Sequence, residues 1–217
     1  MWRFFSTPAP GRYLSADKWW KLCFLFLPLL MSCATLTTQP TIVKTVFLEP
    51  AADLKNAVAP GFELLGRVSV RNENQRFSGN VHWQHTIQED TILLLSPLGQ
   101  AVAEINKNDA GVSLVTSKQE AFYARDVEDL TAEILGWRLP LSGLQYWIQG
   151  QHSPLSAASV DLNGEDRIIA IRQDGWQVLF ARYYTNLSDQ ASAHPRIIEL
   201  QFEDLSIRMV IDNWTKP

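Results

Sequence analysis

Apolar and polar residues alternate with a period of two along most of the chain after residue 61, which is the pattern of β-strands that bury one face. The clearest example is "RIIELQFED", in which Ile198, Leu200 and Phe202 alternate with charged and amide side chains. The stretch that follows, "LSIRMVID", shows the same alternation. This pattern predicts about eleven strands, near residues 65–71, 76–86, 90–96, 101–107, 110–116, 120–124, 159–163, 167–173, 176–184, 196–203 and 205–212.

The connections between these strands are short, and this sets their direction. Only Glu203 and Asp204 separate the last two predicted strands, which is too little for a parallel crossover, so the pair forms an antiparallel hairpin. Asp174-Gly175 marks another hairpin between "RIIAIR" and "WQVLFARYY". Short connections predict a mainly β domain built as an antiparallel meander. So many strands curl under their own twist, and the one-sided pattern makes the concave face apolar.

The middle of the chain breaks the alternation and predicts two short amphipathic helices. "DVEDLTAEILGW" has Asp126 as N-cap, acidic residues in its first turn and Gly136 as a stop. "LSGLQYWIQG" repeats the arrangement, with Ser142 as cap and Gly150 after the helix. The apolar faces of the two helices comprise Val127, Leu130, Ile134, Leu144, Trp147 and Ile148. We expect these helices to plug or cover the open side of the curled sheet.

The beginning of the chain has a different pattern, which is typical of an export signal. Basic residues precede "LCFLFLPLLM", an apolar run of about ten residues that is too short to span a bilayer but fits the core of a signal peptide. The run ends in Leu30-Met31-Ser32-Cys33, which resembles the lipobox of bacterial lipoproteins, where the cysteine is acylated and becomes the first residue of the mature chain. We therefore expect residues 1–32 to be a lipoprotein signal peptide and Cys33 to be lipidated.

An ordinary signal peptide with an incidental cysteine is the alternative. Cysteine usage favours lipidation, because Cys23 leaves with the signal and Cys33 then remains as a lone thiol in an exported protein. Without residues 1–32 the chain carries 15 Lys and Arg against 22 Asp and Glu, a net charge of −7. An acidic protein gains no attraction to an anionic lipid surface, so attachment has to come from acyl chains.

The residues after Cys33 predict a tether followed by one domain. "ATLTTQPTIVKT" is rich in Thr and Pro and has no period, as expected of a linker. "PAADLKNAV" is amphipathic and predicts a short helix that packs on the outside of the domain. We assign residues 33–58 to the lipidated cysteine and tether, and residues 59–217 to a single domain, since one β-rich domain commonly has this length.

The sequence offers little for catalysis or metal binding. His82 and His85 are the only close histidine pair, and three residues apart on a strand they point to opposite faces. The acidic pair Glu128-Asp129 falls at a helix start, where capping explains it. The sequence has no phosphate-binding glycine loop and no nucleophile elbow. We therefore expect no enzyme activity, no metal or cofactor, and no nucleic-acid partner, which would need a basic surface.

Tryptophan and one turn are the unusual features of the sequence. The predicted domain contains five of the eight tryptophans, namely Trp83, Trp137, Trp147, Trp176 and Trp214. Core packing explains each one alone, but together with the apolar concave face they suggest a partly hollow interior that accepts apolar ligands. The turn "SPLG" places Leu98 where Asn, Asp or Ser is usual. Either this turn folds back and packs Leu98 on the protein, or Leu98 stands in solvent or in an apolar phase.

Several separated motifs together resemble one known family. The lipobox, the meander, "SPLG" after "ILLL", "LPLSGLQYWIQG", "GWQVLF" and "MVIDNW" resemble the LolB family of outer-membrane lipoprotein receptors. The resemblance runs from about Gly61 to Trp214. It implies an unclosed β-barrel with a hydrophobic cavity, covered by short helices. It also implies that the cavity accepts the acyl chains of lipoproteins from the periplasmic carrier LolA and releases them into the inner leaflet of the outer membrane.

The resemblance further implies a location and a membrane contact. Ala34 after Cys33 is similar to outer-membrane lipoproteins, so we expect a lipid-anchored monomer on the periplasmic face of the outer membrane. Its expected partners are LolA, lipidated cargo and the inner leaflet. Leu98 matches the protruding-loop leucine with which this family releases cargo, and Pro97 and Gly99 complete the membrane-insertion loop.

The cavity is expected to be lined by apolar residues of the predicted strands and helices. The candidates are Val68, Val81, Trp83, Leu130, Ile134, Trp147, Ile148, Trp176, Val178, Phe180, Ile198, Leu200, Phe202, Ile207 and Met209. Two other classes of protein stay open. A membrane-anchored, lipocalin-like binder of a small lipid, which the sequence features alone favour, predicts the cavity without carrier contact. A structural lipoprotein of an assembly machine predicts a filled core.

Overall fold

The computed structural model describes residues 41–52, 59–184 and 194–215 of the 217-residue chain. The chain divides into two compact units, Met1–Gln39 and Pro40–Pro217, and all described residues belong to the second. The expected signal peptide, Cys33 and most of the predicted outer helix therefore lie outside the described residues. Within the described ranges, no helix is both long enough and apolar enough to cross a membrane.

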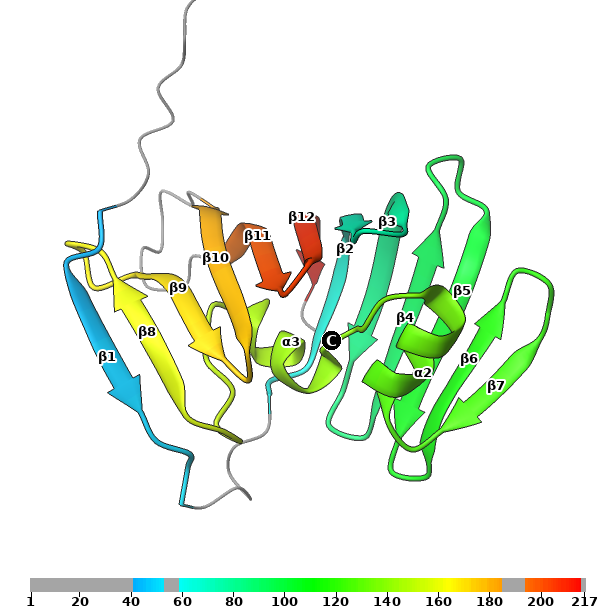
Figure 1. The fold of residues 1–217 in the computed structure, drawn as a ribbon, viewed down its shortest axis with the longest axis horizontal. Coiled ribbons are helices and arrows are strands. Elements are labelled where there is room, and N and C mark those ends of the chain that lie inside the picture. The colour runs from blue at the N-terminus through cyan, green and yellow to red at the C-terminus, as the bar shows by residue number, and fades with distance from the viewer. Residues whose placement is uncertain (1–40, 53–58, 185–193, 216–217) are drawn as a thin grey trace, which may run out of the picture. The chain divides into compact units, whose positions relative to one another are not determined.

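Twelve strands in the described residues form one antiparallel sheet (Figure 1). They are β1 Lys44–Leu48, β2 Phe62–Arg71, β3 Arg76–His85, β4 Glu89–Leu95, β5 Ala101–Asn108, β6 Gly111–Thr116, β7 Ala121–Ala124, β8 Ala158–Leu162, β9 Ile168–Gln173, β10 Trp176–Tyr183, β11 Pro195–Phe202 and β12 Leu205–Thr215. All eleven predicted strands are confirmed, with ends that differ by a few residues. The largest differences are at β2 and β12, which are longer than predicted because they pair with each other along their whole length.

The strand order across the sheet is β1-β8-β9-β10-β11-β12-β2-β3-β4-β5-β6-β7. The sheet is thus a meander in two runs, β2 to β7 and β8 to β12, which are joined by the pairing of β2 with β12 from Arg71↔Ser206 to Glu63↔Thr215. β1 and β7 stand at the two ends of this order and are not paired with each other. The sheet is therefore an unclosed barrel, as the resemblance implied.

β1 is a strand that the sequence analysis did not predict, since it falls in the stretch expected to be a tether. It pairs with β8 from Lys44↔Leu162 to Leu48↔Ala158. Its five residues are exposed or half-buried, so no clean alternation marks it in the sequence. The strand forms because β8 otherwise leaves its outer backbone groups unpaired, and an open sheet edge is a template for one more strand.

Two helices lie on the concave side of the sheet (Figure 1). α2 (Val127–Leu135) has the predicted ends, because Asp126 Oδ1 accepts a hydrogen bond from the backbone N of Asp129 and Gly136 adopts a left-handed φ of 78°. α3 (Leu141–Trp147) begins after Pro140 and has no side-chain cap, so the prediction of Ser142 as its N-cap is wrong. The helix starts earlier than its apolar pattern indicates, since proline already fixes a helical φ.

A buried carboxylate, Asp161, holds β1 and β9 to β8. It accepts hydrogen bonds from Thr45 Oγ1 at 2.7 Å and from both terminal nitrogens of Arg172 at 2.7 Å. The hydrogen bond from Arg172 lowers the pKa of Asp161 below its usual value. A lowered pKa stabilises the fold above the pKa of the unfolded chain, about 4, and this stabilisation is lost as the pH falls through the lower pKa of the folded protein.

We expect Asp161→Asn to lower the free energy of unfolding by about 1–3 kcal/mol at neutral pH, because it removes a charged acceptor from a buried site. The loss should shrink as the pH falls from about 4, where the unfolded chain becomes protonated, through the lower pKa of Asp161 in the folded protein. Asp212→Asn is the matched control, since Asp212 accepts two hydrogen bonds from Arg67 but at an exposed site. Urea unfolding at neutral and acidic pH measures both variants, and equal, pH-independent losses would contradict the role given to Asp161.

Candidate functional site

The fifteen residues predicted to line the cavity lie together in one apolar cluster on the concave side. Thirteen of them are buried, while Ile134 and Phe202 are half-buried and pack against the others. The cluster, called here the concave cluster, combines the inner faces of β2 to β6 and β8 to β12 with the apolar faces of α2 and α3. The alternation read from the sequence therefore assigns these side chains to the correct face.

Aromatic rings form much of the concave cluster. Trp83 meets Phe62 edge to face, with ring centroids 4.8 Å apart. Trp176 lies between Trp147, at 6.3 Å, and Phe202, at 5.1 Å. Rings of this size supply large, rigid apolar contact areas. The cluster thus offers a surface that suits hydrocarbon chains and little that would hold a polar ligand.

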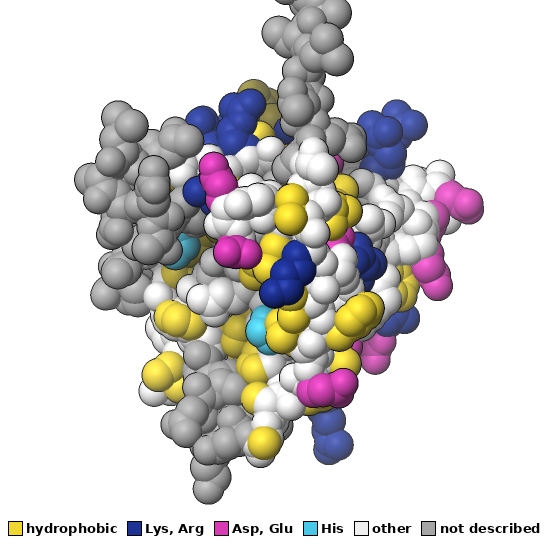
Figure 2. Space-filling model, turned by 90° about the vertical axis from the view of Figure 1, so that its left-hand side faces the viewer, with side chains coloured by type: hydrophobic (Ala, Val, Ile, Leu, Met, Phe, Trp, Pro, Cys, Tyr) yellow, Lys and Arg dark blue, Asp and Glu magenta, His cyan; other side chains and the backbone are white. Residues whose placement is uncertain are grey.

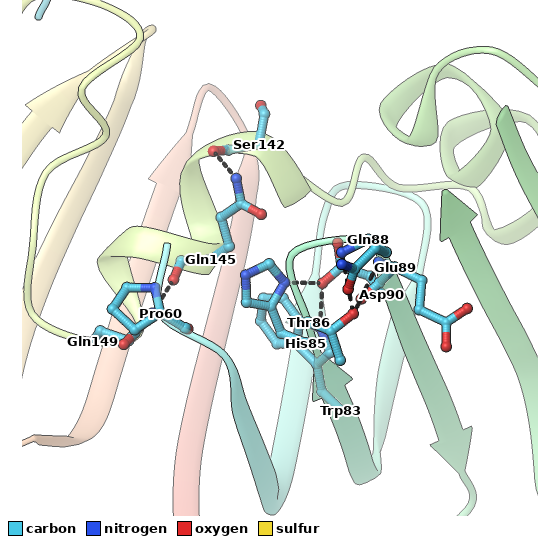
Figure 3. A network of polar contacts seen from close by, with 10 residues as sticks. All are labelled: Pro60, Trp83, His85, Thr86, Gln88, Glu89, Asp90, Ser142, Gln145 and Gln149. Carbon is cyan, nitrogen blue, oxygen red and sulfur yellow. Dashed lines mark hydrogen bonds and ion pairs between the residues drawn. The ribbon is translucent and has the colours of Figure 1, made fainter. Parts of the chain in front are cut away.

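One polar group at the edge of the cluster is Asp90, in the network of Figure 3. Its Oδ1 accepts a hydrogen bond from Trp83 Nε1 at 2.8 Å and lies 2.8 Å from His85 Nδ1, and all three residues are buried. His82 points to the outer face, where its Nε2 lies 2.7 Å from Glu63. The prediction that the two histidines face opposite ways is confirmed. The buried carboxylate fixes the Trp83 ring at the edge of the cluster.

A second polar group, Gln173 on β9, holds α3 in place. Its Oε1 accepts hydrogen bonds from Trp147 Nε1 and from the backbone N of Ser153, both at 2.9 Å. Its Nε2 donates to the carbonyl of Ser153 at 2.7 Å and to Ser156. One buried amide therefore joins the end of α3 and the segment after it to the sheet.

α2 and α3 pack over the concave side, and a groove opens on the outer face of the sheet. This groove has a volume of about 380 Å³. It is lined by Arg67, Val68, Ser69, Ser78, Gly79, Asn80, Pro97, Arg208 and Val210. The two arginines are paired with Asp212 and Glu199. The exposed lining of this groove is mostly apolar, but it lies on the outer face between two ion pairs and away from the aromatic rings of the cluster. The concave cluster therefore remains the candidate site.

Leu98 stands alone at the tip of the hairpin between β4 and β5. The turn closes through Gly99 N, which donates to the Ser96 carbonyl at 2.9 Å, and Gly99 adopts a φ of 81° that favours glycine. Asn80 Nδ2 on β3 donates to the same carbonyl and steadies the base of the turn. The side chain of Leu98 is 89% exposed. The alternative in which the turn folds back and packs Leu98 on the protein is therefore wrong.

Residues 60–214 match the family model described as outer membrane lipoprotein LolB. The chain belongs to the LolB family. The outer-membrane lipoprotein LolB of Nitrosomonas europaea is 41% identical over 199 residues, which cover 92% of each chain. That of Thiobacillus denitrificans is 39% identical over 170 residues, or 78% of this chain and 88% of the relative. A solved LolA superfamily structure from Nitrosomonas europaea aligns over 73% of this chain and 87% of its own, with a TM-score of 0.47 and 7% identity.

In this LolB family member, the buried polar contacts of three inward-facing residues, His85, Asp90 and Gln173, were not predicted from the sequence. A signal for them was present, because each lies in phase with the inward positions of its strand. His85 follows Trp83, Asp90 precedes Ile92, and Gln173 follows two buried isoleucines. A polar residue at an inward position of a strand has to find a buried partner.

We expect Gln173→Leu to lower the free energy of unfolding by about 2–4 kcal/mol, because it keeps the volume but leaves the Trp147 and Ser153 donors buried without an acceptor. Gln177→Leu on the exposed face of neighbouring β10 is the matched control and should change stability little. Urea unfolding followed by tryptophan fluorescence measures both. The same midpoint for the two variants would rule out the anchoring role of Gln173.

Proposed function

We propose that this LolB family member is a receptor that accepts lipoproteins from the periplasmic carrier LolA and inserts them into the inner leaflet of the outer membrane. In this proposal Cys33 carries the acyl chains that anchor the protein, as a monomer, on the periplasmic face. The concave cluster binds the acyl chains of the cargo, and Pro97, Leu98 and Gly99 form the loop that enters the leaflet. Membership of the LolB family supports this assignment.

The position of Leu98 is the observation that carries the proposal. Leu98 lies at the tip of β4 and β5, whose inner side chains Ile92, Leu94, Ala103 and Ile105 belong to the concave cluster. The same two strands thus connect buried hydrocarbon with an exposed leucine. Moving one leucine from water into hydrocarbon contributes about 1.5–3 kcal/mol. This is enough to bring the tip into a leaflet and too little to anchor the protein.

The direction of transfer follows from apolar burial in this proposal. Each methylene of an acyl chain that is buried from water contributes about 0.8 kcal/mol. A receptor that buries the chains slightly better than the carrier draws them across when the two sites meet. The bilayer buries them better still, so release is also favourable. Leu98 then acts on the rate of release.

Entry of acyl chains requires access to the concave side, which α2 and α3 cover. α3 is held to β9 through the buried amide of Gln173. The end of α2 is joined to the turn before β3 through Asn72 Nδ2, which donates to the Gly136 carbonyl at 3.0 Å in a partly buried site. A bond that water can reach is easier to replace than a buried network. We infer that α2 is the helix that moves to admit the chains.

Two other classes of protein compete with this proposal. A structural lipoprotein of an assembly machine would have a filled core in place of a cavity. A lipocalin-like binder of a small lipid would bind fatty acids without LolA. Transfer of a tagged lipoprotein from loaded LolA to this protein distinguishes the receptor from both, because neither alternative takes cargo from the carrier.

We expect Leu98→Glu to take cargo from LolA at the normal level and to retain it, with insertion into liposomes slowed by about tenfold or more, because a carboxylate is costly to place in a leaflet. Ile87→Glu is the matched control, since Ile87 is also an exposed apolar residue (71%) and precedes β4 in the hairpin at its opposite end. Pull-down of the tag and liposome flotation measure the two steps. Normal insertion by Leu98→Glu would refute the release role of Leu98.

We expect a lipopeptide with brominated acyl chains to quench the tryptophan fluorescence of the protein, because bromine quenches indoles that it contacts in the concave cluster. Replacing Trp147 by Phe should remove part of the quenched signal, since Trp147 is buried in the cluster. Trp214→Phe is the comparison, because Trp214 lies at the margin of the concave cluster, where its ring meets Phe62 at 5.3 Å and stacks on His194. If Trp214→Phe removes the quenching and Trp147→Phe does not, the acyl chains do not bind beside Trp147.

A further inference from the structure

β1 carries exposed apolar side chains that the proposed function does not use. Ile42 and Val43, just before the strand, are 56% and 66% exposed, and Phe47 within it is 79% exposed. Single exposed apolar residues are common on protein surfaces, but three within six positions of an edge strand form a patch. The segment is firmly held, since Val43 N donates to the Leu162 carbonyl at 2.9 Å and Thr45 is bonded to Asp161.

The start of β1 lies close along the chain to the expected lipid anchor. Only eight residues lie between Cys33 and Ile42, so even a fully extended chain reaches no more than about 30 Å. In Figure 1, β1 begins on the upper side of the molecule, the side at which the hairpin with Leu98 projects. The start of β1 and Leu98 can therefore face one membrane surface, whereas Phe47 lies further down the strand.

Basic side chains surround the start of β1. Register places Lys44 opposite Leu162 and Leu162 opposite Ile168, and at the same end of the sheet Arg182 lies opposite Ile197. The basic residues at or next to these positions are Lys44, Arg167, Arg182 and Arg196. In Figure 2, which looks onto the β1 side, Lys and Arg side chains stand at the upper end of this face.

This end of the sheet differs in charge from the rest of the protein. Among the described residues the neighbouring acidic residues are Glu165 and Asp166, in the turn between β8 and β9, and Asp212 on β12, which pairs with Arg67; Glu165 lies 3.8 Å from Arg167. With Arg67 included, five basic residues face three acidic ones among the described residues, a local positive excess, although the chain without residues 1–32 has a net charge of −7. Lys and Arg near a membrane surface are attracted to anionic headgroups.

We propose that this end of the sheet is a second membrane contact, in which Ile42 and Val43 enter an anionic phospholipid leaflet and Lys44, Arg167, Arg182 and Arg196 lie among its headgroups. The proposal rests on the lipid anchor at Cys33 that is part of the proposed function. With the anchor and Leu98, the contact gives the domain three points on one surface. Three points fix its orientation, so that the hairpin tip stays directed at the leaflet.

The test uses the lipidated protein in vesicles of phosphatidylethanolamine and phosphatidylglycerol, with a fluorescent label on Val43→Cys, Phe47→Cys or Leu98→Cys. Nitroxide-labelled phospholipid quenches a label that enters the leaflet. We expect strong quenching at Val43 and Leu98 and weak quenching at Phe47. Phe47 is the matched control, because it is exposed on the same strand and by alternation on the same face as Val43.

Charge is tested in the same preparation. Lys44→Gln combined with Arg182→Gln should reduce the quenching at Val43 by about threefold or more in vesicles with phosphatidylglycerol, because the attraction to anionic headgroups is weakened. In vesicles of phosphatidylcholine alone the same pair of substitutions should have no effect. A charge effect of equal size in both kinds of vesicle would contradict a contact with an anionic leaflet.

Three outcomes would overturn the proposal. If the label at position 98 is quenched and the label at position 43 is not, the hairpin contacts the membrane and β1 does not. Equal quenching at Val43 and Phe47 would mean that the strand lies flat on the membrane rather than entering by its end. Disulfide pairing of Val43→Cys between two copies would assign the edge to self-association. Transfer of cargo from LolA, measured alongside, reports on the proposed function, since it can proceed whether or not Val43 is quenched.

Discussion

The pairing of β2 with β12 is the constraint on which the rest of the structure depends. It joins two meanders into one sheet and leaves β7 at one end of the strand order, with β8 next to the other end. The chain between β7 and β8 therefore has to cross the whole sheet. Crossing on the concave side places α2 and α3 over the apolar face, where Val127, Leu130 and Trp147 are buried. The cover of the candidate site is thus a consequence of topology.

Two buried polar side chains hold tryptophan rings of the concave cluster in place. Asp90 and Gln173 occupy inward positions of their strands, and each uses its hydrogen-bonding capacity on an indole of the concave cluster. A buried amide with its partners satisfied is costly to disturb, because any partner left alone loses its hydrogen bond in an apolar medium. The tryptophan rings Trp83 and Trp147 are consequently fixed, and the concave surface between them consists of apolar side chains.

Much of the fold could be predicted because local rules agree with the tertiary structure. Period-two alternation identified eleven strands, and Asp126 and Gly136 marked the ends of α2. β1 escaped prediction because its residues are exposed or half-buried, and its partner β8 lies more than 100 residues away. The cap of α3 was predicted wrongly because Pro140 starts the helix before Ser142, and the serine side chain caps nothing. Pairing partners and exact helix starts depend on contacts that alternation does not describe.

The sequence predicts which face of the sheet carries the candidate site, but not what covers that face. Alternation assigns Trp176, Val178 and Phe180 to the concave side, and it would do so whether a helix or an acyl chain covered them. In the proposed function acyl chains replace α2 on this apolar surface, so that helix and cargo compete for it. The affinity for cargo is then the difference between the burial given by acyl chains and the burial that α2 gives up. This competition makes cargo binding weaker than it would be if the whole apolar surface were free. Weaker binding favours release, which a receptor that passes its cargo to a bilayer requires.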